Sequence, residues 1–171
     1  METFEINNRR YLGNKFKLLP FIRQVVDNEC ENINSVFDVF SVTGSVAYDF
    51  RDKRLFVNDM MYSNYSSAVT WFSPENVDFG KLEAYINFYN SYDASHENNY
   101  MSQNFSDTYF SKLVCQKIGF IRDNIESEWE KGKVNFRERS VIITSLIYAM
   151  DRIANTYGHY DSFIRITPHS R

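Results

Sequence analysis

Residues 35–59 read Ser-Val-Phe-Asp-Val-Phe-Ser-Val-Thr-Gly-Ser-Val-Ala-Tyr-Asp-Phe-Arg-Asp-Lys-Arg-Leu-Phe-Val-Asn-Asp. The run from Val36 to Phe40 is apolar and rich in aromatic and β-branched residues, which predicts a buried strand. A turn of small residues with one glycine follows at Ser41 to Ser45, and Val46 to Phe50 can open a helix. A second short strand is predicted at Leu55 to Val57, just before Asn58-Asp59. The stretch therefore predicts a strand, a tight turn, a helix and a second strand, which is followed by the acidic residue Asp59.

This order of elements suits the binding of a nucleotide-like ligand. The turn places backbone N–H groups at the start of a helix, where they can hold ligand oxygens. An acid that closes the second strand can accept hydrogen bonds from a ribose. A lone glycine between a strand and a helix is also ordinary turn chemistry, so both interpretations stay open at this point.

The residues upstream add a second motif. They read Arg10-Tyr11-Leu12-Gly13-Asn14-Lys15-Phe16-Lys17-Leu18-Leu19-Pro20. Together with Asp38 to Val46 and Asn58-Asp59, this order resembles the amino-terminal half of S-adenosylmethionine-dependent DNA adenine methylases. The resemblance is to the bacterial restriction-modification branch, which begins with Tyr-x-Gly-x-Lys and carries Asp-x-Phe-x-Gly-x-Gly. It implies an α/β class I methyltransferase (Rossmann-like) fold, helix-rich and incomplete in its sheet.

The resemblance also implies a cofactor pocket for S-adenosylmethionine. Lys15 would meet the methionine carboxylate, the Ser41–Ser45 turn the methionine moiety, and Asp59 the ribose hydroxyls. A solvated surface position is the alternative for Lys15, and ordinary core packing is the alternative for Met60 and Met61. The full set of expected cofactor-binding residues is Tyr11, Lys15, Phe40, Ser41, Gly44, Ser45, Asp59 and Met60.

Two departures from the family pattern stand out. Val42 occupies the first glycine position, where its Cβ can crowd the cofactor; a positive φ there would cost a β-branched residue roughly 1–3 kcal/mol. The prolines at positions 20, 74 and 168 are not adjacent, so the family's catalytic Asp-Pro-Pro-Tyr is absent from these 171 residues. We therefore assign no catalytic residue and expect the chain alone to be inactive. A second polypeptide would supply the catalytic strand, or the chain would self-associate.

The rest of the chain predicts helices. They are expected from Pro20 to about Glu29, from Tyr62 to Phe72, around Leu82 to Tyr89, from Ser106 to Trp129 with Ser106 or Asp107 as the cap, and from Phe136 to Asn155. The last of these has almost no polar side, which predicts a buried helix. Residues 91–105 are rich in Asn, Ser and Tyr, and form either a DNA-facing recognition segment or a polar surface loop.

Three functional parts follow from this pattern. Residues 1–72 would be the cofactor-binding core, 73–135 a helical and irregular segment that includes the possible recognition region, and 136–171 a buried helix and tail that lead to the missing strand. A non-catalytic remnant or binding subunit with the same fold is the alternative function. A nucleotide-binding domain of another class, such as an oxidoreductase half, fits less well because Gly-x-Gly-x-x-Gly is absent.

Composition sets the remaining bounds. The chain is 43% hydrophobic and 24% charged, with a net charge of −3, so it carries no overall basic charge that would favour DNA. Its two cysteines, Cys30 and Cys115, fit no metal-ligand spacing. No run of residues is long and apolar enough to span a membrane, and residues 1–10 do not resemble a signal peptide. We expect a cytoplasmic protein with DNA as a partner and no membrane contact.

Overall fold

The computed structural model describes Ile6, residues 14–157 and residues 160–164. The chain divides into two compact units, Met1–Ser73 and Pro74–Arg171. Both units are rich in helix, and the sheet of the described residues has two strands. The structure is therefore mixed and helix-rich, with a small parallel sheet. Residue 135 lies inside the second unit, so the functional division expected there stays a prediction.

The first unit contains the sheet and the helices that flank it. In chain order its elements are a 3-10 turn at Phe16–Leu18, α1 (Leu19–Glu29), β1 (Ser35–Asp38), α2 (Ser45–Asp49), β2 (Arg54–Val57) and α3 (Tyr62–Phe72). Pro20 lies in the first turn of α1, where its missing N–H costs no hydrogen bond. The bounds of α3 are those that the sequence predicted.

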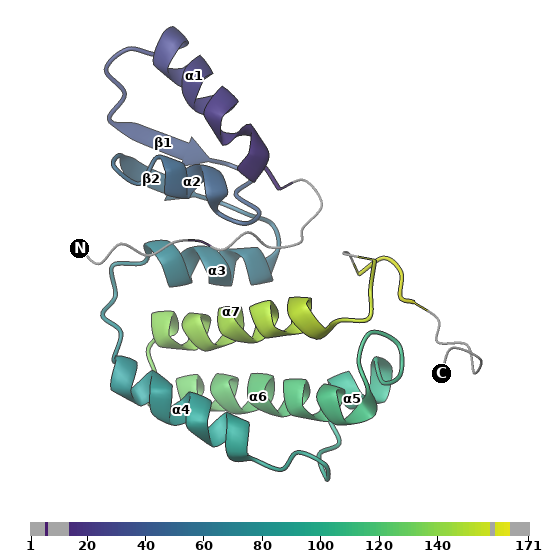
Figure 1. The fold of residues 1–171 in the computed structure, drawn as a ribbon. Coiled ribbons are helices and arrows are strands. Elements are labelled where there is room, and N and C mark those ends of the chain that lie inside the picture. Colours follow the sequence, from purple (N-terminus) through teal and green to yellow (C-terminus); the bar gives the residue numbers. More distant parts are fainter. Residues whose placement is uncertain (1–5, 7–13, 158–159, 165–171) are drawn as a thin grey trace. The chain divides into compact units, whose positions relative to one another are not determined.

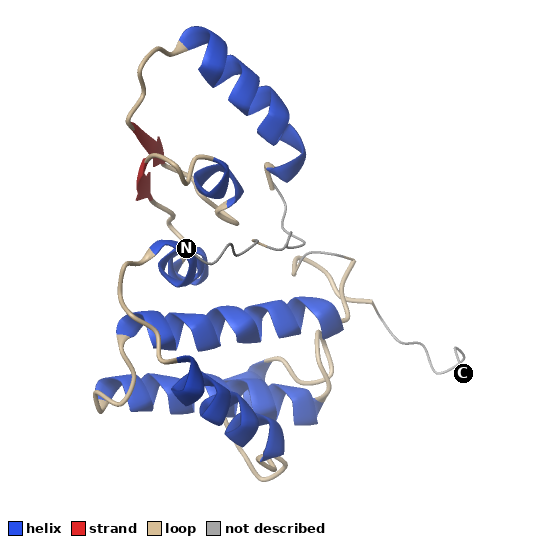
Figure 2. Cartoon of the chain, turned by 60° about the vertical axis from the view of Figure 1, so that its left-hand side comes forward, coloured by secondary structure: helices blue, strands red, loops and turns tan. Residues whose placement is uncertain are grey.

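β1 and β2 are parallel and in register, with Ser35 opposite Arg54 and Asp38 opposite Val57. Figure 2 shows them as a short ribbon beside α2. The predicted first strand, Val36 to Phe40, began one residue late and ended two residues late, because the strand starts at Ser35 and the chain turns after Asp38. It was also expected to be buried, yet Phe37 is 62% exposed. Its ring meets the ring of Phe56 edge-on, at 6.4 Å between centroids.

The second unit is helical. Its elements are α4 (Phe79–Ser91), α5 (Tyr100–Asn104), α6 (Lys112–Glu130) and α7 (Phe136–Ile153), and α6 and α7 lie side by side (Figure 1). One cluster of buried side chains joins α4, α6 and α7 and contains Leu82, Tyr89, Ile125, Val134 and Ile142. A second cluster, at the start of α6, contains Phe110, Cys115 and Ile118.

Four expectations for this unit were wrong. α6 begins at Lys112 and is capped by Ser111, because Asp107 has φ +60° and its N–H donates to Phe110 O, closing a turn ahead of the helix. α7 ends at Ile153, two residues early. It is not buried throughout, because Ile153 is 58% exposed. Residues 91–105 were expected to contain no helix, but α5 lies within them.

Residues 94–105 are held against α6 by polar side chains. Gln116 on α6 donates from Nε2 to the carbonyls of Ser95 (2.9 Å) and Glu97 (2.8 Å). Asn99 caps α5 by accepting from the N–H of Ser102 and donates to Gln116 O at 2.8 Å. The backbone of this segment is thus tied down over much of its length, which a mobile surface loop would not show.

Gly119 makes this attachment possible, and its replacement should break it. A Cβ at position 119 would lie 2.0 Å from Asn99 Oδ1, closer than any real contact. We expect Gly119→Ala to displace Asn99 and its cap, and to lower the free energy of unfolding by about 1–3 kcal/mol. Gly80→Ala on α4 is the control, because its Cβ would meet nothing nearer than 3.5 Å. Thermal unfolding of both variants measures the difference, and equal stability of the two would contradict the prediction.

Glu128 on α6 makes the second unit sensitive to acid. Hydrogen bonds from Lys133 and Tyr85 outweigh desolvation of the carboxylate and hold the pKa of Glu128 at about 2, below its ordinary 4.5. The Tyr85 hydroxyl donates at 2.8 Å. Because the folded-state pKa lies below the unfolded one, this stabilisation is complete above about pH 4.5. It is lost as the pH falls toward 2.

We expect Glu128→Gln to lower the free energy of unfolding by about 1–3 kcal/mol at pH 7. The deficit should shrink at pH 3, where the wild-type carboxylate has lost part of its advantage. Urea unfolding at both pH values measures it, with the exposed Glu83 on α4 changed to Gln as the control. A deficit of the same size at both pH values would show that the ionised carboxylate is not its source.

Candidate functional site

The polar groups of the first unit gather where its two strands end. β1 ends at Asp38 and β2 at Val57, and the parallel arrangement brings these ends to one edge of the sheet. The turn of residues 41–45 leaves this edge and leads into α2, and Asp59 follows β2. We call Lys15, Asp38, residues 41–45 and Asp59 the turn site.

Asp59 holds the turn through its carboxylate. Oδ2 accepts from the Val42 N–H at 2.8 Å, and Oδ1 accepts from the Met61 N–H at 2.9 Å and from Asn64 Nδ2 at 3.1 Å. Desolvation raises the pKa of Asp59, but these hydrogen bonds outweigh it and keep the pKa below its ordinary value. The carboxylate is therefore ionised at neutral pH, and it fixes the turn against the end of β2.

The turn contains two residues with positive φ. Gly44 precedes α2 at φ +77°, and Val42 has φ +51°. Strain was expected from the sequence if φ at position 42 were positive, and φ is positive. Val42, a β-branched residue, therefore adopts a left-handed backbone conformation at a cost of roughly 1–3 kcal/mol. The bond from the Val42 N–H to Asp59 holds this conformation. The Thr43 and Ser45 hydroxyls add a buried contact at 2.8 Å, which fixes the start of α2.

Asp38 is a site residue that the list of expected pocket residues missed. The residue is 9% exposed, and its carboxyl accepts from the backbone N–H groups of Ala47 and Phe40. Burial raises its pKa above the ordinary value, against the opposing effect of Lys15. Within the described part of the chain, Asp38 Oδ2 and the buried hydroxyl of Ser41 have no hydrogen-bond partner. The acid of the Asp-x-Phe motif was the signal that could have identified Asp38.

The other expected residues lie in different settings. Lys15 Nζ donates to Phe40 O at 2.8 Å, so this ammonium is fixed at the turn site and is not merely solvated. Phe40 is 64% exposed and Met60 is 92% exposed, so core packing does not describe Met60. Ser41, Gly44 and Ser45 form the turn itself, whereas Tyr11 lies outside the described residues.

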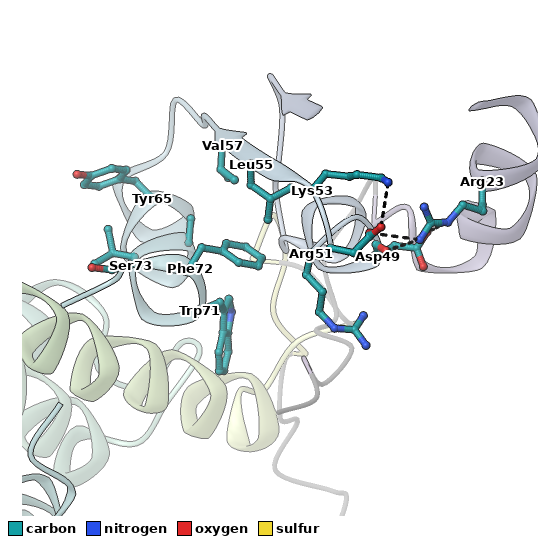
Figure 3. Close-up of a pocket in the computed structure, with 13 residues that line it drawn as sticks. Arg23, Asp49, Arg51, Lys53, Leu55, Val57, Tyr65, Trp71, Phe72 and Ser73 are labelled. Carbon is teal, nitrogen blue, oxygen red and sulfur yellow. Dashed lines mark hydrogen bonds and ion pairs between the residues drawn. The ribbon is translucent and has the colours of Figure 1, made fainter. Parts of the chain in front are cut away.

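A cavity of about 820 Å³ in the first unit lies elsewhere (Figure 3). It is lined by residues of β2 and α3, by Arg23 of α1 and Asp49 of α2, and by residues 51–53. Of the expected cofactor residues that the structure describes, none lines it. The turn site is thus a cluster of oriented polar groups at the sheet edge, outside this cavity.

Ile6, residues 14–157 and residues 160–164 contain no group of three or more His, Cys, Asp or Glu side chains able to hold a metal ion. None of their helices has the length and hydropathy of a membrane-spanning segment.

Comparison with known proteins gives one family and three relatives. The profile of the D12 class N6 adenine-specific DNA methyltransferases matches residues 11–170. The modification methylase StsI of Streptococcus sanguinis is 32% identical over 169 residues, which cover 91% of this chain and 26% of that protein. The modification methylase LlaI of Lactococcus lactis subsp. lactis is 27% identical over 170 residues, covering 91% of this chain and 27% of the relative.

The third relative is the type II methyltransferase M.FokI of Planomicrobium okeanokoites, 27% identical over 173 residues, covering 91% of this chain and 26% of the relative. The chain therefore spans about a quarter of the length of the curated relatives it matches. No solved structure matches the chain significantly.

Proposed function

The chain belongs to the D12 class N6 adenine-specific DNA methyltransferase family, and on that premise we propose that it forms the cofactor-binding half of such an enzyme. The proposed fold is of the class I methyltransferase type, with β1 and β2 as two strands of its parallel sheet. The observation that carries the proposal is the turn site. An ionised acid follows β2 and holds the backbone of the strand-to-helix turn, at the sheet edge where α/β proteins bind nucleotides.

The proposed cofactor is S-adenosylmethionine, which supplies the methyl group. Lys15 would hold its carboxylate, and the turn of residues 41–45 would hold the methionine moiety. The buried Asp38 Oδ2 and Ser41 Oγ, both without a partner among the described residues, are the polar atoms that such a ligand would satisfy. Asp59 would accept from the ribose hydroxyls with the lone pairs that Val42, Met61 and Asn64 leave open.

The proposed substrate of the complete enzyme is the exocyclic amine of adenine in DNA. Methyl transfer requires the adenine to leave the duplex and to be held against the methyl group. The chain has no Asp-Pro-Pro-Tyr to do this, so we propose that a second polypeptide carries the catalytic strand. Residues 91–105, held on α6 by Gln116 and Asn99, would face the DNA.

Calorimetric titration of the chain with S-adenosylmethionine and S-adenosylhomocysteine tests the cofactor assignment. We expect saturable binding of both compounds, because the groups of the turn site are already in place. Binding of neither would contradict the assignment. Binding that Asp38→Asn leaves unchanged would remove Asp38 from the site.

A further inference from the structure

Asn64 is a buried polar residue in the first turn of α3, and its side chain meets the acid of the turn site. It is 2% exposed, and its amide Nδ2 donates to Asp59 Oδ1 at 3.1 Å. The same oxygen accepts from the N–H of Met61, the residue before α3, at 2.9 Å. The start of α3 therefore directs two donors at one carboxylate oxygen of Asp59. Because a buried amide is costly unless it is hydrogen-bonded, this contact constrains both side chains.

The other carboxylate oxygen of Asp59 meets the strand-to-helix turn. Oδ2 accepts from the Val42 N–H at 2.8 Å, and Val42 has φ +51°. The terminal torsion of an aspartate has broad minima, so the carboxylate turns easily unless its oxygens are held. Since the two oxygens turn together, the donor on Oδ1 also fixes the direction of Oδ2. Asn64 thus acts on Val42 through Asp59.

The charges around Asp59 suit a neutral donor at position 64. Desolvation is the largest effect on the pKa of Asp59 and raises it, but hydrogen bonds, including the one from Asn64, and the Lys15 ammonium together outweigh it. Asp38 at the end of β1 is a second acid, and its repulsion with Asp59 raises the pKa of Asp38. A third acid in this place would add to the repulsion. An amide lowers the pKa of Asp59 without adding charge.

We propose that Asn64 is a positioning residue of the cofactor site. Its amide orients the Asp59 carboxylate, and the carboxylate holds Val42 and the turn in the conformation that receives the ligand. Position 64 thereby also sets how ligand binding depends on pH. The inference rests on the proposed function for the identity of the ligand, whereas the link from α3 to the turn can be tested without one. Sites of this kind depend on the groups that hold the ligand-contacting residues in place.

The first test needs no ligand and measures hydrogen exchange of the Val42 amide in the full chain by NMR. Asn64→Leu removes the donor and keeps a side chain of similar size. We expect exchange at Val42 to accelerate about tenfold or more, because Asp59 no longer holds the N–H steadily. The rate is taken relative to that of the Asn58 amide, which donates to Asp38 O within the sheet at 2.9 Å. This ratio removes any change in global stability.

Ser67→Ala is the matched control for this measurement. Ser67 is also buried on α3, and its hydroxyl donates to Ser63 O at 3.0 Å, within the same helix. Its replacement removes a buried polar group from α3 and leaves the donor to Asp59 in place. The ratio of exchange rates at Val42 should therefore stay at its wild-type value.

The second test changes the charge at position 64 and measures binding of S-adenosylhomocysteine by calorimetry. In Asn64→Asp two neighbouring acids share a proton at low pH, and the protonated oxygen donates to Asp59 as the amide does. At high pH both acids are ionised and repel each other. Relative to wild type at the same pH, we expect binding to be weaker by about tenfold or more at pH 8 and restored to within about threefold at pH 5. Circular dichroism at both pH values confirms that the variant is folded.

The two tests separate the possible failures. If wild type binds no S-adenosylhomocysteine, the cofactor assignment fails, whereas faster exchange at Val42 in Asn64→Leu still establishes that Asn64 positions the turn. An unchanged exchange ratio in Asn64→Leu would overturn the proposal. So would an affinity of Asn64→Asp that follows wild type at both pH values, or one that is reduced equally at both, since a purely structural role predicts no rescue at low pH.

Discussion

Purified chain incubated with labelled S-adenosylmethionine and mixed-sequence DNA is expected to transfer no methyl group above background. An adenine amine is a weak nucleophile, and its methylation depends on positioning of the flipped base against the methyl group. In the family that this chain resembles, Asp-Pro-Pro-Tyr supplies the acceptors for the amine and the ring that stacks on the base. The prolines at positions 20, 74 and 168 exclude that motif from these residues, so the expected loss is complete.

The assay needs a positive control and a measure of assembly. The modification methylase StsI, of which this chain covers 26%, is a suitable control under the same conditions. Sedimentation of the chain beside the assay shows whether a monomer was tested. Clear methyl transfer by a monomer would refute the prediction and would require a catalytic group other than the expected motif.

Replacement of Asp59 by Ala is expected to weaken binding of S-adenosylhomocysteine by about 10- to 100-fold, the range for hydrogen bonds to a charged group. The carboxylate is ionised and is held by Val42, Met61 and Asn64. Its removal takes away the proposed acceptor of the ribose hydroxyls and also frees the strained turn. Calorimetry of wild type and variant measures the loss, with the exposed Asp27 of α1 changed to Ala as the matched control.

A modified ligand separates the two effects of Asp59. The 2′-deoxy form of S-adenosylhomocysteine should bind wild type about tenfold more weakly than the parent compound, but should bind Asp59→Ala almost as well as the parent does. If the variant still discriminates between the two ligands, Asp59 acts through the turn alone. If it binds the parent compound as tightly as wild type does, the assignment of Asp59 is wrong.

Local chemistry explains which parts of the fold could be predicted. The end of α3 was predicted correctly because the helix that begins at Tyr62 is followed by Ser73-Pro74, which a helix cannot pass easily. The start of α6 was misplaced because Ser106 and Ser111 are both good caps. The choice between them depends on the left-handed conformation of Asp107, which the pattern of residues does not reveal. α5 was missed because a helix of five residues has no period to detect.

In the candidate site, too, some features could be predicted from the sequence and others depend on the tertiary structure. The order of the motifs predicted that Lys15, the turn and Asp59 lie together, and the structure places all three at one sheet edge. The burial of Asp38 is a tertiary property. It depends on α2 folding back over the end of β1, so that the Ala47 N–H reaches the carboxyl. The exposure of Phe37 likewise depends on what covers the sheet, which a short apolar run cannot specify.

The contact between Asn99 and Gly119 has an evolutionary consequence. Because a Cβ at position 119 would overlap the Asn99 side chain, the two positions cannot change independently. A lineage that gains a side chain at position 119 must first lose the amide at position 99, and with it the cap of α5 and the link to Gln116. Related sequences with a side chain at position 119 are therefore expected to carry a small residue at position 99, and the combination of a bulky residue at each position should be missing among them.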